Sequence, residues 1–241
     1  MASDAIPNSP EGSIPYEGAT GIKSNETKRN EAMLMASVLG LNAINVAVYS
    51  MASPPPSFQP LRNVSAARAA GSAMLASVSH VHPTHLALNM AAFTWLSSGL
   101  REDRHGAAHV LSLYGCGALG GAAGHSIAKS LSGAKTVLPA VRGASGAVCA
   151  VAAALPFCRG SSATAEGATL PLIPPVTIPA SWGSALILMA LLNPRDIMTK
   201  GGLRLSVGSH CGGAFAGCLY GMAFVSRASA EQKKEPKQLS H

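Results

Sequence analysis

Charged residues are missing from long stretches of this chain, and their absence limits the folds that it can adopt. The stretches without Asp, Glu, Lys or Arg are residues 32–61, 69–100, 105–128, 143–158, 167–194 and 205–226. A helix on the surface of a soluble protein has a wet face, on which a charge recurs every few residues. These six stretches have no such face, so they are typical of helices that lie in lipid.

The lengths of the stretches indicate helices that cross a membrane. A helix needs about 20 mostly apolar residues to cross ~30 Å of hydrocarbon. Five of the six stretches are long enough, and only residues 143–158 are too short. We therefore predict an all-α membrane protein, a bundle of six transmembrane helices with a short central fourth helix. Only 12% of the 241 residues are charged, about half the ~25% of an ordinary soluble domain.

The predicted six-helix membrane domain spans residues 32–226. A polar N-terminal tail, residues 1–31, precedes it, and a basic C-terminal tail, residues 227–241, follows it. The prolines that follow Ser53 are expected to end the first helix, because consecutive prolines cannot continue one. The expected helices are residues 32–52, a second that runs to Leu100, 107–128, a fourth that starts near Gly143, 176–193 and 205–226.

The net charge of +7 does not indicate nucleic-acid binding. The basic residues lie in short connections between the predicted helices and in the tail, where membrane proteins usually place them.

The cysteines lie inside apolar stretches without a Cys-x-x-Cys pair, so we expect packing residues rather than disulfides or zinc ligands. They are Cys116, Cys149, Cys158, Cys211 and Cys218. We expect no nucleic-acid partner, no metal and no cofactor.

Polar residues inside the predicted helices are the side chains that can carry chemistry. The second helix contains His80, His82, His85 and Asn89. His85 and Asn89 are four residues apart and share one helical face, and His82 is expected one turn before His85 on that face. The fourth helix opens with Gly-Ala-Ser145-Gly, and the sixth contains His210.

Three of these residues, one from each helix, are expected at one depth in the membrane. The second, fourth and sixth helices run in the same direction if each span is crossed once. Counted from the C-terminal ends of their helices, His85, Ser145 and His210 lie ~22, ~20 and ~22 Å deep. An unpaired imidazole at that depth would be costly. We therefore expect the three side chains to meet.

This combination supplies the groups that acyl transfer needs. Ser145 can act as the nucleophile, His210 as the general base, and the donors of the second helix can bind an oxyanion. Gly143 and Gly146 let backbone approach closely around Ser145, and a helix N-terminus offers free N–H groups. None of the six stretches contains a carboxylate. The sequence therefore predicts a Ser–His dyad without a buried acid.

Each motif also has a purely structural interpretation. A Gly-x-Ser-Gly in a chain rich in small residues is often a helix-packing device, and His210 alone can be a buried histidine bonded to a carbonyl. His80, His82 and His85 resemble a metal cluster, but two of the three would face apart on a helix. The glycines of the sixth helix are typical of helix packing. No role is predicted for His105, His109 and His125.

Together the three motifs resemble the rhomboid family of intramembrane serine proteases. The resembling residues are His80, His85-Leu-Ala-Leu-Asn89-Met90, Gly143-Ala-Ser145-Gly146-Ala and His210-Cys-Gly-Gly213-Ala-Phe-Ala-Gly217. The resemblance covers about residues 31–226. Within it, residues 75–90 and the Gly-Ala-Ser-Gly-Ala run are most similar to the mitochondrial, presenilin-associated branch.

The resemblance implies a role for each matching residue. Ser145 matches the family nucleophile and His210 its general base, while His85 and Asn89 match the side chains that help the Ser145 N–H bind the oxyanion. The family cleaves transmembrane substrates at sites with small residues, without a metal, and substrates approach laterally near the second and fifth helices. We therefore expect single-pass or multi-pass transmembrane substrates, contact with membrane lipid, and a location in the mitochondrial inner membrane.

The sequence departs from the common family pattern at several positions. Cys149 stands four residues after the nucleophile, where many bacterial members have a Tyr that packs on the catalytic His. His210 is therefore expected to be held differently. No Trp-Arg pair precedes His80, and Glu102 and Asp103 do not keep the usual spacing from the preceding glycine.

Two other functions stay open at this point. One is a catalytically inactive relative that binds transmembrane helices, and the intact Ser145 and His210 argue against it. The other is a small channel or transporter that uses the polar level as a permeation site. The absence of carboxylates from the six stretches makes that function less favoured.

Overall fold

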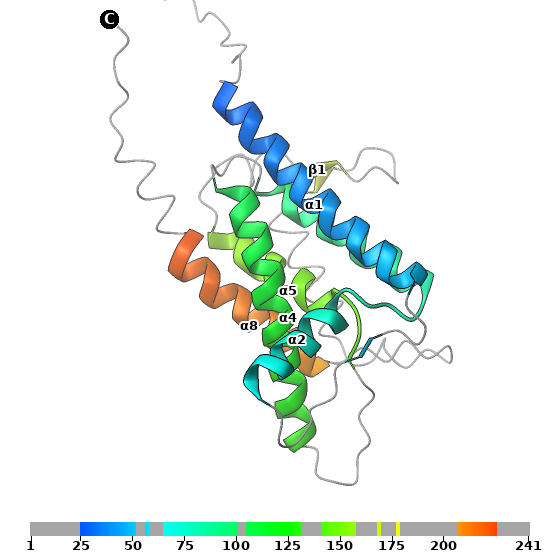
Figure 1. Cartoon of the computed structure of the whole chain (residues 1–241). Coiled ribbons are helices and arrows are strands. Elements are labelled where there is room, and N and C mark those ends of the chain that lie inside the picture. The colour runs from blue at the N-terminus through cyan, green and yellow to red at the C-terminus, as the bar shows by residue number, and fades with distance from the viewer. Residues whose placement is uncertain are drawn as a thin grey trace, which may run out of the picture.

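The computed structural model describes the chain in eight segments. They are residues 25–51, 56–57, 65–100, 105–131, 141–157, 168–169, 177–178 and 207–225. The helices are α1 (Asn25–Met51), α2 (Ala66–Ser77), α3 (Pro83–Ser98), α4 (Gly106–Leu131), α5 (Ser145–Ala154) and α8 (Val207–Tyr220), with η1 (Leu155–Phe157) after α5 and η2 (Gly221–Val225) after α8 (Figure 1). The expected all-α bundle with a short helix at its centre is confirmed.

A small antiparallel ladder accompanies the helices. Strand β1 (Ala168–Thr169) pairs with β2 (Thr177–Ile178), and Ala168 lies opposite Ile178. The predicted fifth helix, residues 176–193, lies outside the described residues apart from 177–178. Those two residues are extended, so the prediction of helix from 176 is wrong at this end.

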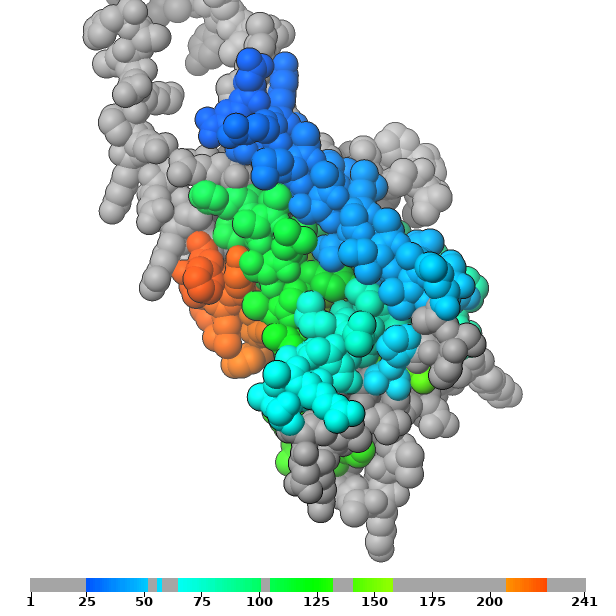
Figure 2. All heavy atoms as spheres, in the orientation of Figure 1, coloured from blue at the N-terminus to red at the C-terminus, as the bar shows by residue number. Residues whose placement is uncertain are grey.

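Helix α1 begins earlier than the sequence predicted. It starts at Asn25 rather than at residue 32. Its first turns contain Glu, Lys and Arg, whose helix propensities are similar to that of Leu, so the helix continues beyond the apolar stretch. Of the described helices, α1 alone is long and apolar enough by itself to cross a membrane. Figure 2 shows α1 along one side of α4, with α8 on the other side.

The second charge-free stretch forms two helices, α2 and α3, rather than the one predicted. Helix α2 is capped by Ser65, whose Oγ accepts from the Arg68 N–H at 3.3 Å, and it ends at Ser77, with Val78 as its C-cap. Helix α3 begins at Pro83, whose ring has no N–H to continue a preceding helix. The residue before it, His82, is extended with φ −123° and ψ 140°. His80 and His82 therefore lie in a connection, and His82 does not occupy the turn before His85.

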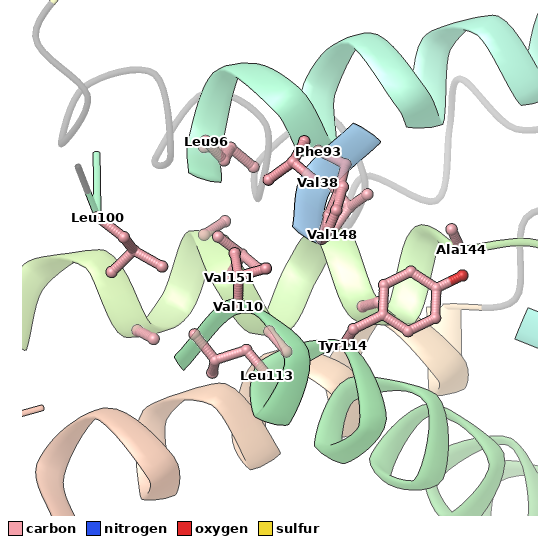
Figure 3. Close-up of a cluster of buried hydrophobic side chains, with 14 of the residues drawn as sticks. Val38, Phe93, Leu96, Leu100, Val110, Leu113, Tyr114, Ala144, Val148 and Val151 are labelled. Atoms are coloured by element: carbon pink, nitrogen blue, oxygen red, sulfur yellow. The ribbon is translucent and has the colours of Figure 1, made fainter. Parts of the chain in front are cut away.

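The core is built around α5, all of whose residues are buried. It packs between α4 and α8 and also contacts α3. Figure 3 shows side chains from α1, α3, α4 and α5 in one apolar cluster, including Val38, Phe93, Leu113 and Val148. A helix that is apolar on every side must be enclosed in this way. The start of α5 is thereby held inside the bundle.

Candidate active site

Ser145 is the first residue of α5, and the backbone before it is tightly held. Gly143 has a φ of 109°, in the left-handed region that favours glycine. Its N–H donates to the carbonyl of Ala76 at 2.9 Å, which ties this loop to the end of α2. Ala144 is the N-cap, and its carbonyl accepts from Val148 N at 2.9 Å. Ser145 thus lies at the N-terminus of a buried helix, where the first N–H groups have no partner within the helix.

The side chain of Ser145 is hydrogen-bonded to a histidine on a different helix. Nε2 of His210, on α8, lies 2.9 Å from Oγ of Ser145. Both residues are buried, with exposed fractions of 6% for Ser145 and 1% for His210. An imidazole nitrogen at this distance from a hydroxyl is placed to exchange a proton with it.

Close packing of α8 on α5 brings these two side chains together. Gly213 lies one turn after His210, and it faces the backbone of Gly146 so closely that a Cβ there would overlap the Gly146 carbonyl. Glycines at both positions remove the side chains that would keep the helices apart. The sequence prediction that the Gly-rich run of this helix is a packing device is in line with this contact.

Carboxylates are scarce in the part of the chain that the structure describes. Glu26 and Glu31 are the only acidic residues in its segments, and both lie near the start of α1. No described residue near Ser145 can therefore supply the acid of a catalytic triad.

Asn89 and His80 form a second hydrogen-bonded group beside Ser145. Nδ2 of Asn89, on α3, donates to Nε2 of His80 at 3.1 Å. The same nitrogen accepts from the N–H of Ala144 at 3.4 Å. Because Nε2 accepts both bonds, we assign the ring proton of His80 to Nδ1. His80 thereby connects α3 to the residue that precedes Ser145.

His85 lies against Gly143 and beside His80. A Cβ at Gly143 would be 2.7 Å from Cε1 of His85, so only glycine leaves room for this ring. The rings of His80 and His85 meet edge to face, with centroids 5.2 Å apart. Nε2 of His85 is buried and has no hydrogen-bond partner. A buried nitrogen without a partner is costly unless a ligand completes it.

The structure brings all five predicted site residues together, and it adds His80 to them. Ser145 bonds to His210, His85 packs on Gly143, and Asn89 reaches the same loop through His80. Sequence reasoning assigned no site role to His80. Its separation of five residues from His85 would place the two rings apart on a continuous helix, and the break before Pro83 is what brings them together.

Cys149 and His109, which the sequence does not place in the site, contribute to the packing of the helices. Cys149 is fully buried on α5, one turn after Ser145. His109 of α4 bonds through Nδ1 to the Tyr220 hydroxyl at 2.9 Å, which links α4 to α8. Among the described residues, no group of three His, Cys, Asp or Glu side chains is arranged to hold a metal ion.

Comparison with known protein families identifies the fold. The family model of the rhomboid domain matches residues 70–227. The chain belongs to the rhomboid family. The match runs from α2 to the end of η2 and includes every residue of the site described above, whereas α1 precedes it. A rhomboid domain is an all-helical membrane fold, so the chain is an integral membrane protein. No curated protein matches the chain in sequence.

The match identifies the family and not a branch within it. Rhomboid proteins act on transmembrane substrates, and most are serine proteases that work within the membrane. The family thus accounts for the expected fold and for the class of partner. The similarity to mitochondrial members stays a prediction, as do the chemical roles of the site residues.

Proposed function

We propose that this protein is an intramembrane serine endopeptidase that uses Ser145 as its nucleophile and His210 as its general base. The observation that carries the proposal is the 2.9 Å hydrogen bond between Ser145 Oγ and His210 Nε2 inside a rhomboid domain. A serine hydroxyl is a weak nucleophile at neutral pH, and a neutral imidazole that accepts its proton activates it.

The reaction proceeds through an acyl-enzyme. Oγ of Ser145 attacks the carbonyl carbon of the scissile peptide bond, and its proton passes to Nε2 of His210. The tetrahedral intermediate collapses as His210 returns that proton to the leaving amine, so the peptide bond breaks and an ester on Ser145 remains. Water then attacks the ester, again giving a proton to His210, and releases the carboxyl product and the free serine.

The oxyanion of the intermediate needs donors that are already in place. The N–H of Ser145 is available at the N-terminus of α5, and the helix dipole favours negative charge there. Asn89 has a second N–H besides the one that it donates to His80. His85, with its buried and unpartnered Nε2, is the third donor in its Nε2–H tautomer. Gly143 contributes by leaving room for the His85 ring.

The proposed substrates are single-pass or multi-pass transmembrane proteins, which contact the enzyme in the plane of the lipid. The family supports this class of substrate. We further propose the mitochondrial inner membrane as the location, because residues 75–90 resemble the mitochondrial branch. No metal or cofactor takes part in the proposed chemistry, since every proton transfer uses His210.

A comparison of membrane-protein fragments tests the proposal in cells. Cells that produce the unmodified protein and cells that produce Ser145→Ala are fractionated, and the termini of membrane-protein fragments are quantified. We expect a set of termini, within or next to transmembrane segments, that depends on Ser145. Ser126→Ala, which changes a serine on α4 whose Oγ donates to the Ala122 carbonyl, is the matched control and should keep these fragments. Identical fragments with and without Ser145 would instead favour an inactive relative that binds transmembrane helices.

A further inference from the structure

Two asparagines on α1 anchor this helix to different parts of the bundle. Nδ2 of Asn42 donates to Oγ1 of Thr94, on α3, at 2.8 Å. Nδ2 of Asn45 donates to the hydroxyl of Tyr114, on α4, at 3.1 Å and to the carbonyl of Leu41 at 2.8 Å. Asn45 is completely buried, with an exposed fraction of 0%. The family match starts at residue 70, so these contacts join a helix outside the match to helices within it.

Tyr114 connects Asn45 to the end of α2. Its hydroxyl donates to the carbonyl of Ser77 at 3.1 Å, which is shorter than its 3.4 Å distance to Oδ1 of Asn45, so we assign its proton to Ser77. The ring packs edge to face on Phe93 of α3, with centroids 5.4 Å apart (Figure 3). Tyr114 is 2% exposed, and its hydroxyl is enclosed by the groups that it bonds. Contacts with Asn45, Ser77 and Phe93 therefore fix the position of the Tyr114 side chain.

The end of α2 is in turn the support of the loop before Ser145. Ser77 is the last residue of α2, and the carbonyl of the preceding Ala76 accepts from Gly143 N at 2.9 Å and from Ser79 N at 3.2 Å. The segment that follows leads directly to His80, which accepts from Ala144 N. A shift of Ser77 would therefore move both supports of the nucleophile loop together.

We propose that Asn45 and Tyr114 are positioning residues of the active site, which hold the end of α2 so that Gly143 and Ser145 keep their places. This inference rests on the proposed function and adds α1 to the machinery of the site. Neither side chain touches the reacting atoms. They act through the Ser77 carbonyl, the Ala76 carbonyl and the Gly143 N–H in that order.

The chain offers a matched pair of variants for the test. Tyr114→Phe removes the hydroxyl and keeps the ring on Phe93. Thr94→Val removes a hydroxyl that also bonds an α1 asparagine but does not lead to α2. Each variant removes one hydrogen bond of an α1 asparagine, so both are expected to lower stability. They differ in whether the Ser77 carbonyl loses its donor.

The first measurement is activity per folded molecule. Folded protein is isolated in detergent, and the rate constant of labelling by a fluorophosphonate and the kcat on a transmembrane substrate are determined. A displacement of ~1 Å at a nucleophile lowers the rate by up to ~100-fold. We expect Tyr114→Phe to lower both quantities by about 10- to 100-fold with KM little changed, and Thr94→Val to stay close to the unmodified protein. Equal rates in Tyr114→Phe and the unmodified protein would overturn the inference.

The second measurement does not depend on catalysis. Hydrogen exchange of the peptide that contains Gly143 reports its bond to Ala76. Each variant is measured at the same number of degrees below its own midpoint of thermal unfolding. Under these conditions we expect faster exchange in Tyr114→Phe than in Thr94→Val. Slow exchange in both variants would overturn the inference even in an active protease. Fast exchange in Tyr114→Phe, combined with no labelling of the unmodified protein, would confirm the contact chain and overturn the catalytic role that we give it.

Discussion

Nε2 of His80 accepts a hydrogen bond from Nδ2 of Asn89 at 3.1 Å, so a residue of the connection before α3 fixes the orientation of an amide on α3. The same nitrogen accepts from Ala144 N at 3.4 Å. One imidazole thus sets the relative placement of an oxyanion donor and the nucleophile loop. The proposed catalytic role of Ser145 therefore requires this connection to be intact.

Replacement of the oxyanion donor on α3 should separate turnover from labelling. In Asn89→Ala one donor of the transition state is lost, which costs about 2.7 to 4 kcal/mol, or about 100- to 1,000-fold in kcat. The nucleophile and its base are unchanged, so labelling by a fluorophosphonate should still be detectable. Peptide-bond cleavage and labelling are measured on the same preparation. Complete loss of both would instead indicate that Asn89 is needed for folding.

Replacement of His80 should affect the same site through position rather than through direct contact. His80→Ala removes the acceptor for two buried N–H groups, and each unsatisfied group costs about 1 to 3 kcal/mol of folding free energy. We expect a lower midpoint of thermal unfolding and a lower kcat in the protein that remains folded. His80→Gln, whose side-chain carbonyl can accept, should recover part of kcat. A role in stability alone predicts that kcat per folded molecule does not change in either variant.

Substitution of Gly143 tests whether the His85 ring must pack against this glycine. In Gly143→Ala a Cβ would lie 2.7 Å from Cε1 of His85, at a φ of 109° that side chains rarely adopt. A left-handed backbone costs a non-glycine residue about 1 to 2 kcal/mol, and displacement of His85 removes an oxyanion donor. We expect loss of most cleavage activity and lower stability, measured by turnover and thermal unfolding.

Gly71→Ala is the control for that substitution. Gly71 lies within α2, where no neighbouring atom lies within 4 Å of the methyl group that alanine would add, and alanine favours a helix over glycine by up to ~1 kcal/mol. This variant should be as stable as the unmodified protein or more so, with full activity. An active Gly143→Ala would show that His85 is not required where the structure places it.

The helix contact behind the dyad predicts the effect of a methyl group at Gly213. In Gly213→Ala the new Cβ overlaps the backbone of Gly146, so α8 must move away from α5. Separation of His210 from Ser145 should lower the labelling rate constant, because the hydroxyl then loses its base. Gly115→Ala on α4, with nothing within 4 Å, should label normally. Normal labelling of Gly213→Ala would mean that the close approach does not hold the dyad together.

The charge pattern of the sequence predicted the helical class and most of the site. Ser145 and His210 were identified because polar residues are rare inside apolar stretches, and the structure places their side chains in hydrogen-bond contact. Helix spacing and depth placed His85 and Asn89 beside them, and the resemblance to rhomboid proteins implied an oxyanion role for each. The rhomboid-domain match confirms that the chain belongs to that family. These features depend on local pattern and on motif order, both of which a sequence displays directly.

The connection between α2 and α3 was not predicted, for a physical reason. Residues 78–82 carry no charge, so charge spacing alone treats them as part of one helix, although Pro83 cannot continue α2. The bridge from His80 to Ala144 joins residues 64 positions apart, and only tertiary packing creates it. The same holds for the contact of Asn45 with Tyr114, 69 positions apart. Long-range pairs of this kind leave no periodic signal in the sequence.

The most direct test of the central claim is the site of covalent labelling. The purified protein is treated with a fluorophosphonate in detergent, and peptide mass spectrometry identifies the modified residue. We predict one adduct, on Ser145, that disappears in Ser145→Ala and is strongly reduced in His210→Ala, because Oγ is nucleophilic only beside its base. Labelling that persists in Ser145→Ala, or the absence of any adduct on the folded, unmodified protein, would contradict the assignment of this chain as a serine protease.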